Sequence, residues 1–120
     1  MFDHVGLHVR NLKVAAKFCS AALQPLGYVV DASGIGFGPP NSPALWLYES
    51  ASTERSGCHV AFRAATRDAV DRFHREGIKA GGRDNGAPGL RADYGSNYYA
   101  AFLIDPDGNN FEAVCMSGEK

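Results

Sequence analysis

The sequence predicts an α+β fold of two βαβββ modules, whose strands form a curved mixed sheet, shaped like a cup, with the helices on its outer face. The first observation is an internal repeat, since a shift of 55 positions places residues 4–7 on residues 59–62 and Phe18 on Phe73. The second is that each copy reads as a strand followed by an amphipathic helix. The third is the 14 glycines among 120 residues, a content typical of short elements joined by tight turns.

The first module, about residues 1–55, begins with a predicted strand at residues 3–9. Asn11 is a suitable N-cap for a helix whose inward stripe includes Val14 and Phe18, and Pro25 and Gly27 end this helix. Three short strands are predicted to follow at residues 28–31, 34–38 and 44–49, separated by glycines and prolines.

The second module, about residues 56–120, repeats this order from a strand at residues 58–63. Thr66 caps a helix that runs to about Glu76 and ends at Gly77, with Val70 and Phe73 facing inward. Residues 78–80 are a candidate short strand, and the glycine-rich residues 81–95 are predicted to be a long irregular loop. Strands at 98–104 and 110–115 follow, joined by an Asp-Pro-Asp-Gly turn.

Length and charge limit the class of protein. A chain of 120 residues suits one domain. Twelve basic and thirteen acidic residues give a net charge of −1, which argues against a nucleic-acid or anionic-membrane partner. No apolar run approaches the ~20 residues of a membrane span, and the N-terminus lacks the features of a signal peptide. We therefore expect a cytoplasmic protein.

The cysteines do not suggest a disulfide framework or a cysteine zinc site. Cys19, Cys58 and Cys115 are an odd number, lie far apart and form no Cys-x-x-Cys pair. Each stands among apolar residues, which favours small reduced core residues over nucleophiles.

Alternation along the strands predicts which side chains share the open face of the sheet. Val5, Leu7 and Val9 should pack on the helices, which leaves His4 and His8 on the open face. The same count places further residues there, namely His59, Glu112, Trp46, Tyr48, Tyr98 and Phe102.

His4 and His59 are histidines at equivalent positions of the repeat, and Glu112 adds one carboxylate. Together they form a donor set that suits a divalent metal such as Zn, Ni, Mn, Co or Fe(II). A metal with open coordination positions binds two oxygens of a small-molecule substrate and stabilises negative charge on them. Each residue alone is more typical of an ordinary strand side chain, so the interpretation depends on their coincidence. His8 is an alternative ligand or a pocket residue.

Two other polar residues are candidates with simple alternatives. Arg91, in the long loop, is a candidate for contacting an anionic substrate group, and the alternative is a solvated loop charge. His74 lies on the second helix and is predicted to be a surface residue.

Four stretches resemble a known family: residues 3–12 (Asp-His-Val-Gly-Leu-His-Val-Arg-Asn-Leu), residues 18–28 in the first helix, residues 59–62, and the run 98–114, which contains Asp105-Pro106-Asp107-Gly108-Asn109-Asn110-Phe111-Glu112. Over essentially the whole chain the sequence resembles the vicinal oxygen chelate superfamily, also called the glyoxalase/bleomycin resistance/dioxygenase superfamily. The resemblance implies paired modules around a divalent metal, often in a homodimer, with His4, His59 and Glu112 as the counterparts of the family's ligands.

One departure from the family limits the reaction. Glyoxalase I enzymes take a second glutamate, both ligand and catalytic base, from the last strand of the first module. The matching position here is Trp46, and Glu49 lies three residues later with the opposite parity, so that only a strand bulge would bring it to the open face. Proton transfer between adjacent carbons needs a base near the metal, so true glyoxalase I activity is not expected.

Two hypotheses about function follow. The first is a metal-dependent enzyme acting on a small molecule with vicinal oxygens, of lyase, dioxygenase or thiol-transferase type, with Trp46, Tyr48, Tyr98, Phe102, His8 and Arg91 around the substrate. The second is a non-enzymatic small-molecule or drug-binding resistance protein of the same fold. Whether one chain or two chains of a homodimer form the site is left open at this stage.

Overall fold

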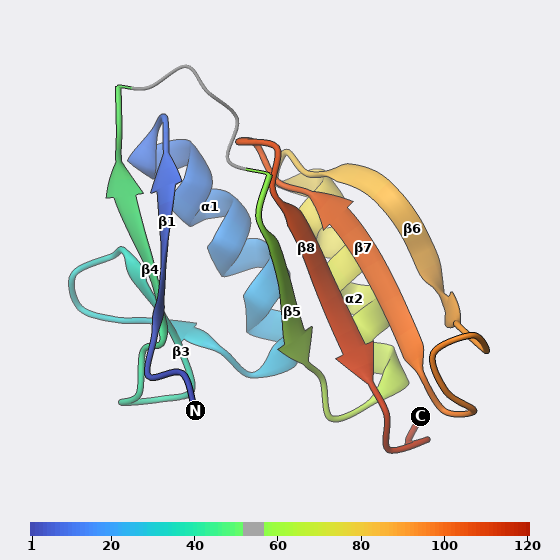
Figure 1. Cartoon of the computed structure of the whole chain (residues 1–120). Coiled ribbons are helices and arrows are strands. Elements are labelled where there is room, and N and C mark those ends of the chain that lie inside the picture. The colour runs from blue at the N-terminus through green and yellow to red at the C-terminus, as the bar shows by residue number, and fades with distance from the viewer. Residues whose placement is uncertain (52–56) are drawn as a thin grey trace.

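The structure is a computed structural model that describes residues 1–51 and 57–120, and every statement below concerns those residues. The predicted boundary between the modules, near residues 55 and 56, lies outside the described residues. Figure 1 shows the two modules beside each other, with the helices behind the strands.

The first module forms a four-stranded sheet and one long helix. Its elements are β1 (Val5–Val9), α1 (Leu12–Leu23), the 3-10 turn η1 (Gln24–Leu26), β2 (Val29–Val30), β3 (Gly36–Gly38) and β4 (Leu45–Glu49). The strand order is β1-β4-β3-β2, with β1 parallel to β4 and the remaining pairs antiparallel. The helix begins as predicted, because the Asn11 side chain accepts a hydrogen bond from the Val14 N–H.

The second module repeats this topology. Its elements are β5 (His59–Arg63), α2 (Arg67–Lys79), β6 (Arg83–Leu90), β7 (Tyr99–Ile104) and β8 (Asn110–Cys115). The order is β5-β8-β7-β6, again with the first strand parallel to the last. The predicted α+β class with two βαβββ modules is therefore confirmed, although the described strands form two separate four-stranded sheets and not one continuous curved sheet.

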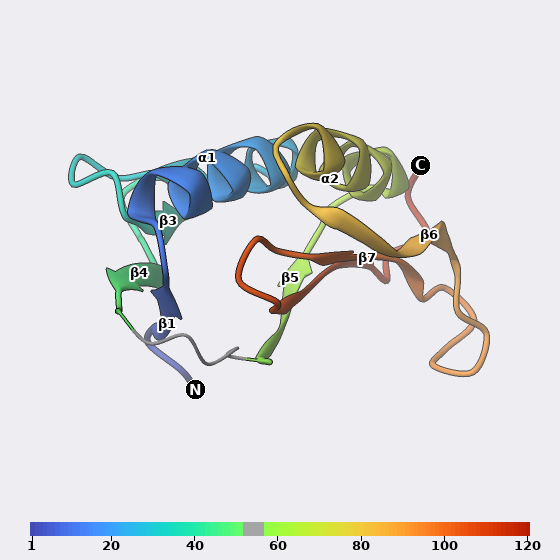
Figure 2. The same cartoon turned by 90° about the horizontal axis from the view of Figure 1, so that it is seen from above.

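Both helices lie on the same side of the molecule. Figure 2 shows α1 and α2 next to each other above the strands, and the two helices contact each other. The buried apolar side chains form one cluster that includes residues of both modules. Phe18 of α1 meets Phe111 of β8 with ring centroids 5.4 Å apart. The core therefore extends across the junction between the modules.

Polar contacts also join the modules. Asp107, in the turn between β7 and β8, is buried and accepts hydrogen bonds from the backbone N–H and the guanidinium of Arg10. The Tyr28 hydroxyl donates to the Arg63 carbonyl oxygen at 2.6 Å. Asp105 folds the turn itself, since it accepts from the backbone N–H groups of Asp107 and Asn109, and burial raises its pKa.

Two predictions about the second module were wrong. The helix does not end at Gly77 but continues to Lys79, so residues 78–80 are not a strand. Gly77 is buried within the helix against Leu103, where a side chain would collide, so this glycine serves close packing instead of helix termination. Residues 81–95 are not wholly irregular, because β6 lies among them as an edge strand with register shifts on either side of Gly86.

Several burial predictions also need correction. Val14 is 46% exposed, so the buried stripe of α1 is Ala15, Phe18, Cys19, Ala22 and Leu23. Val5 is 38% exposed because β1 is an edge strand and its first residue lies beside the junction of the modules. Cys19 and Cys115 are buried as predicted, whereas Cys58 is exposed and is not a core residue.

No helix in the described part of the chain is both long enough and apolar enough to cross a membrane.

Candidate functional site

Three predicted residues meet on the open face of the second module. His59 is the first residue of β5, and Glu112 lies on the neighbouring strand β8 opposite Ala61. The His59 Nε2 atom is 2.8 Å from the Glu112 Oε1 atom. The Tyr98 hydroxyl donates a hydrogen bond to the other oxygen, Oε2, of the same carboxylate. Glu112 is only 3% exposed, so these two side chains supply the partners that water would give an exposed carboxylate.

The phenol of Tyr98 is suited to orient this carboxylate. Burial, followed by the hydrogen bond to Glu112, raises the pKa of Tyr98 to about 12. The hydroxyl therefore stays protonated and remains a donor at neutral pH. The ring is also supported by Tyr94, an edge-to-face neighbour with ring centroids 5.2 Å apart. Sequence reasoning missed Tyr94, whose only signal was an aromatic residue within the glycine-rich segment.

His59 and Glu112 have the right chemistry and spacing for two ligands of one metal. Zinc-type ions bind imidazole nitrogen and carboxylate oxygen at about 2.0–2.2 Å, so adjacent ligand atoms lie roughly 3 Å apart around the ion. The Nε2 and Oε1 atoms are 2.8 Å apart, and only small side-chain movements are needed to place an ion between them. The pair fits a divalent metal as a partial coordination set.

His4 does not join this pair within one chain. Its ring contacts Asp3 at 2.7 Å, and its side chain is 55% exposed. Among residues 1–51 and 57–120, no three His, Cys, Asp or Glu side chains lie close enough together to hold a metal. Figure 1 shows the reason, because β1 and β5 run in opposite directions and their starting ends lie at opposite ends of the junction. The role of the three residues as metal ligands stays a prediction.

The predicted aromatic lining is divided between two surfaces. On the first module, the Tyr48 ring lies over Gly6, where a Cβ atom would be 2.7 Å from it, and the Trp46 ring lies over Gly36. His8 shares this face, and its ring centroid is 6.2 Å from that of Tyr48. Tyr98 and Phe102 instead lie on the second module. The predicted lining residues are thus distributed over both modules of the chain.

Glu49 does not replace the second glutamate of glyoxalase I. Its Oε2 atom accepts a hydrogen bond from the backbone N–H of Leu12, at the first turn of α1. The β4 strand has no bulge that would turn this side chain to the open face, since its register with β1 is unbroken from Leu45 to Glu49. Trp46 occupies the open face opposite Gly6.

Arg91 and His59 both contact the ring of Phe102. Phe102 is opposite Glu112 in the sheet register, and its ring centroid is 6.3 Å from that of His59. The Arg91 guanidinium carbon lies 5.4 Å from the centre of the Phe102 ring. His74, predicted to be at the surface, is more enclosed than expected, since its side chain is 13% exposed and contacts Asp84.

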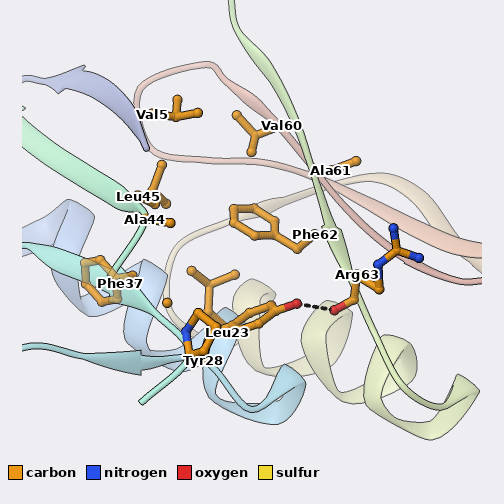
Figure 3. Close-up of a pocket in the computed structure, with 12 residues that line it drawn as sticks. Val5, Leu23, Tyr28, Phe37, Ala44, Leu45, Val60, Ala61, Phe62 and Arg63 are labelled. Atoms are coloured by element: carbon orange, nitrogen blue, oxygen red, sulfur yellow. Dashed lines mark hydrogen bonds between the residues drawn. The ribbon is translucent and has the colours of Figure 1, made fainter. Parts of the chain in front are cut away.

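An apolar groove in the described part of the chain lies elsewhere. Figure 3 shows it between β5 of the second module and the strands of the first, with a volume of about 280 Å³. Its lining is largely apolar and includes Val5, Leu45, Phe37, Tyr28, Val60 and Phe62. Neither His59 nor Glu112 lines the groove, so it is separate from the candidate site.

Similar solved structures share this architecture. A crystal structure of a glyoxalase/bleomycin resistance protein from Albidiferax ferrireducens T118 is 31% identical, with 96% of this chain and 98% of that chain covered and a TM-score of 0.77. A glyoxalase/bleomycin resistance protein/dioxygenase family enzyme from Burkholderia phytofirmans PsJN is 21% identical (95% and 97% covered, TM-score 0.70), which shows the fold alone. Neither a protein-family model nor a curated protein matches the sequence.

Proposed function

Because the chain belongs to the glyoxalase/bleomycin resistance/dioxygenase superfamily, we propose that it is a metal-dependent enzyme acting on a small molecule with vicinal oxygens. One observation carries the proposal: an imidazole nitrogen and a buried carboxylate oxygen lie 2.8 Å apart on the open face of a sheet. A bound divalent metal would supply Lewis-acid stabilisation of negative charge on the substrate oxygens.

The chain's own residues have distinct parts in this proposal. His59 and Glu112 hold the metal, and Tyr98 fixes the orientation of the carboxylate through its second oxygen. Phe102 forms an apolar wall beside the imidazole. Because Trp46 and Glu49 supply no base, the proposed reaction is of dioxygenase or thiol-transferase type and not a glyoxalase I isomerisation.

We propose that His4 of a second copy completes the metal site. Two observations support this. Among the described residues no third ligand joins His59 and Glu112, and β1 and β5, which begin next to His4 and at His59, start at opposite ends of the module junction (Figure 1). A homodimer that pairs the first module of one copy with the second module of the other would form two equivalent sites.

The test combines metal titration with mixed variants. Calorimetric titration of the wild type with Zn²⁺ or Mn²⁺ should give one site per chain. His59→Ala and Glu112→Gln should abolish this binding in folded protein, and His4→Ala should weaken it strongly. Unchanged metal content in the His59→Ala protein would refute the metal site.

Mixing separates a site shared by two chains from a site within one chain. When His4→Ala and His59→Ala proteins are unfolded together and refolded, each mixed dimer should regain one intact site and one doubly altered site. Tight metal binding should therefore return in the mixture, although neither parent shows it. Failure of the mixture to regain binding, with dimers confirmed by sedimentation, would exclude the two-chain arrangement.

A second candidate function is the binding of an aromatic molecule without chemistry. It is favoured by the partly exposed Tyr48 ring, 48% exposed, next to Trp46 at the position where glyoxalase I has its base. Metal-free protein that binds flat aromatic compounds, with quenching of Trp46 fluorescence, would support this function over catalysis.

A further inference from the structure

Arg91 is a cation held in a fixed position over the Phe102 ring, which also contacts His59 of the candidate metal pair. Its Nη1 atom donates to the Gly89 carbonyl oxygen at 3.0 Å, and its Nη2 atom donates to the Ala87 carbonyl oxygen at 2.8 Å. The flat guanidinium also lies over the Phe102 ring. Two hydrogen bonds and one stacking contact therefore order this long side chain before any ligand arrives.

The edge strand β6 is built around this guanidinium. A Cβ atom at Gly86 would lie 3.2 Å from Nη2 and 2.9 Å from the Phe102 ring, and one at Gly89 would lie 3.3 Å from Nη1. The register of β6 against β7 shifts on both sides of Gly86, which is where the strand bends around the side chain. The two glycines thus leave the space that the guanidinium occupies.

The charge of Arg91 is not neutralised by any carboxylate among the described residues. Three other arginines are paired with carboxylates, Arg10 with Asp107, Arg72 with Asp68 and Arg75 with Glu76. Arg91 donates only to backbone carbonyls, and each terminal nitrogen retains a second N–H. Two such donors on one planar group match the two oxygens of a carboxylate.

We infer that Arg91 selects substrates that carry a carboxylate in addition to their vicinal oxygens. The same Phe102 ring contacts the His59 imidazole and lies under the guanidinium, so a ligand held at His59 and Glu112 that reaches past this ring would meet Arg91. This inference rests on the proposed function for the position of the vicinal oxygens. It adds the anionic group that the substrate must have.

The test compares protocatechuate with its neutral amide, two ligands that share vicinal hydroxyl groups and differ in the carboxylate. Calorimetry on the wild type, loaded with Zn²⁺ and also without metal, should show about ten-fold tighter binding of protocatechuate, as expected for a charge-assisted hydrogen-bonded pair. Arg91→Met, which keeps an apolar side chain over Phe102, should remove this preference and leave the affinity for the amide unchanged. Arg83→Met removes the same charge from the first residue of β6, the strand that Arg91 follows, and should retain the preference.

Several results would overturn the inference. These are equal affinity of the wild type for the two ligands, an equal loss for both ligands in Arg91→Met, and no binding of either ligand with or without metal. Failure to bind Zn²⁺ would refute the proposed function alone, because a preference for protocatechuate measured without metal would still support the role of Arg91.

Discussion

Replacing Tyr98 with Phe removes one hydroxyl and leaves the ring in place. The hydroxyl is the hydrogen-bond donor to the Oε2 atom of Glu112, and the other carboxylate oxygen is held by His59. The side chain of Glu112 is 4% exposed, so water cannot readily replace the lost donor. The variant therefore isolates the contribution of a single hydrogen bond to a buried carboxylate.

Two effects are expected from Tyr98→Phe. A hydrogen bond to a charged group contributes about 1.5–3 kcal/mol, so the free energy of unfolding should fall by about that amount. Because an outer partner that orients a metal ligand typically contributes 10–100-fold to affinity, the dissociation constant for Zn²⁺ should rise by roughly that factor. The first quantity is measured by urea unfolding and the second by calorimetric titration.

Tyr99 provides a matched control. It is the next residue, its hydroxyl donates to Asp71 of α2 at 2.6 Å, and its side chain packs towards the helix. Tyr99→Phe should therefore lower stability by a similar amount and leave metal affinity unchanged. If both variants weaken Zn²⁺ binding equally, or if neither does, Tyr98 does not orient Glu112 for a metal and the reasoning fails.

The remaining predictions concern stability. The pKa values of Tyr98 and Tyr99 are both raised from 10.0 to about 12, by burial and Glu112 for Tyr98 and by the Asp71 hydrogen bond and burial for Tyr99. Folding favours the protonated phenols, so their contribution should be complete below pH 10 and lost between pH 10 and about 12. Urea unfolding across this range should show the decline, and a stability that rises with pH there would contradict the assignment. Gly77→Ala should destabilise the protein by about 1–2 kcal/mol. The added methyl group overlaps Leu103, and the free-energy cost of this overlap exceeds the gain from the higher helix propensity of alanine. In a Leu103→Ala background the same change should stabilise the protein by about 1 kcal/mol. If Gly77→Ala lowers the free energy of unfolding in both backgrounds, the packing explanation is wrong.

The faces of the strands could be predicted from local alternation, because the direction of a side chain in a strand depends only on its position. This is why His59, Glu112, Tyr98 and Phe102 were placed together from the sequence alone. Alternation contains no information about which ends of two strands meet. That depends on how the two modules pack against each other, and among the described residues the predicted ligand His4 is not grouped with His59 and Glu112.

The roles of some glycines could not be predicted from local pattern. Gly77 follows a helical pattern near its end, and the usual interpretation of such a glycine is a terminator. Its actual role depends on Leu103, a residue of another strand, and no local pattern indicates that contact. Likewise β6 contains glycines and a proline, which argue against a strand, and its conformation is supported by pairing with β7.

The Arg10 contact with Asp107 and the apolar cluster common to both halves have a consequence for folding. A duplicated sequence invites the view that each half is an autonomous unit, but Phe18 of the first half covers Phe111 of the second. A half expressed alone would expose these rings to water and leave a buried aspartate without its cation. The two copies of the repeat should accordingly melt in one cooperative transition, as parts of a single thermodynamic unit.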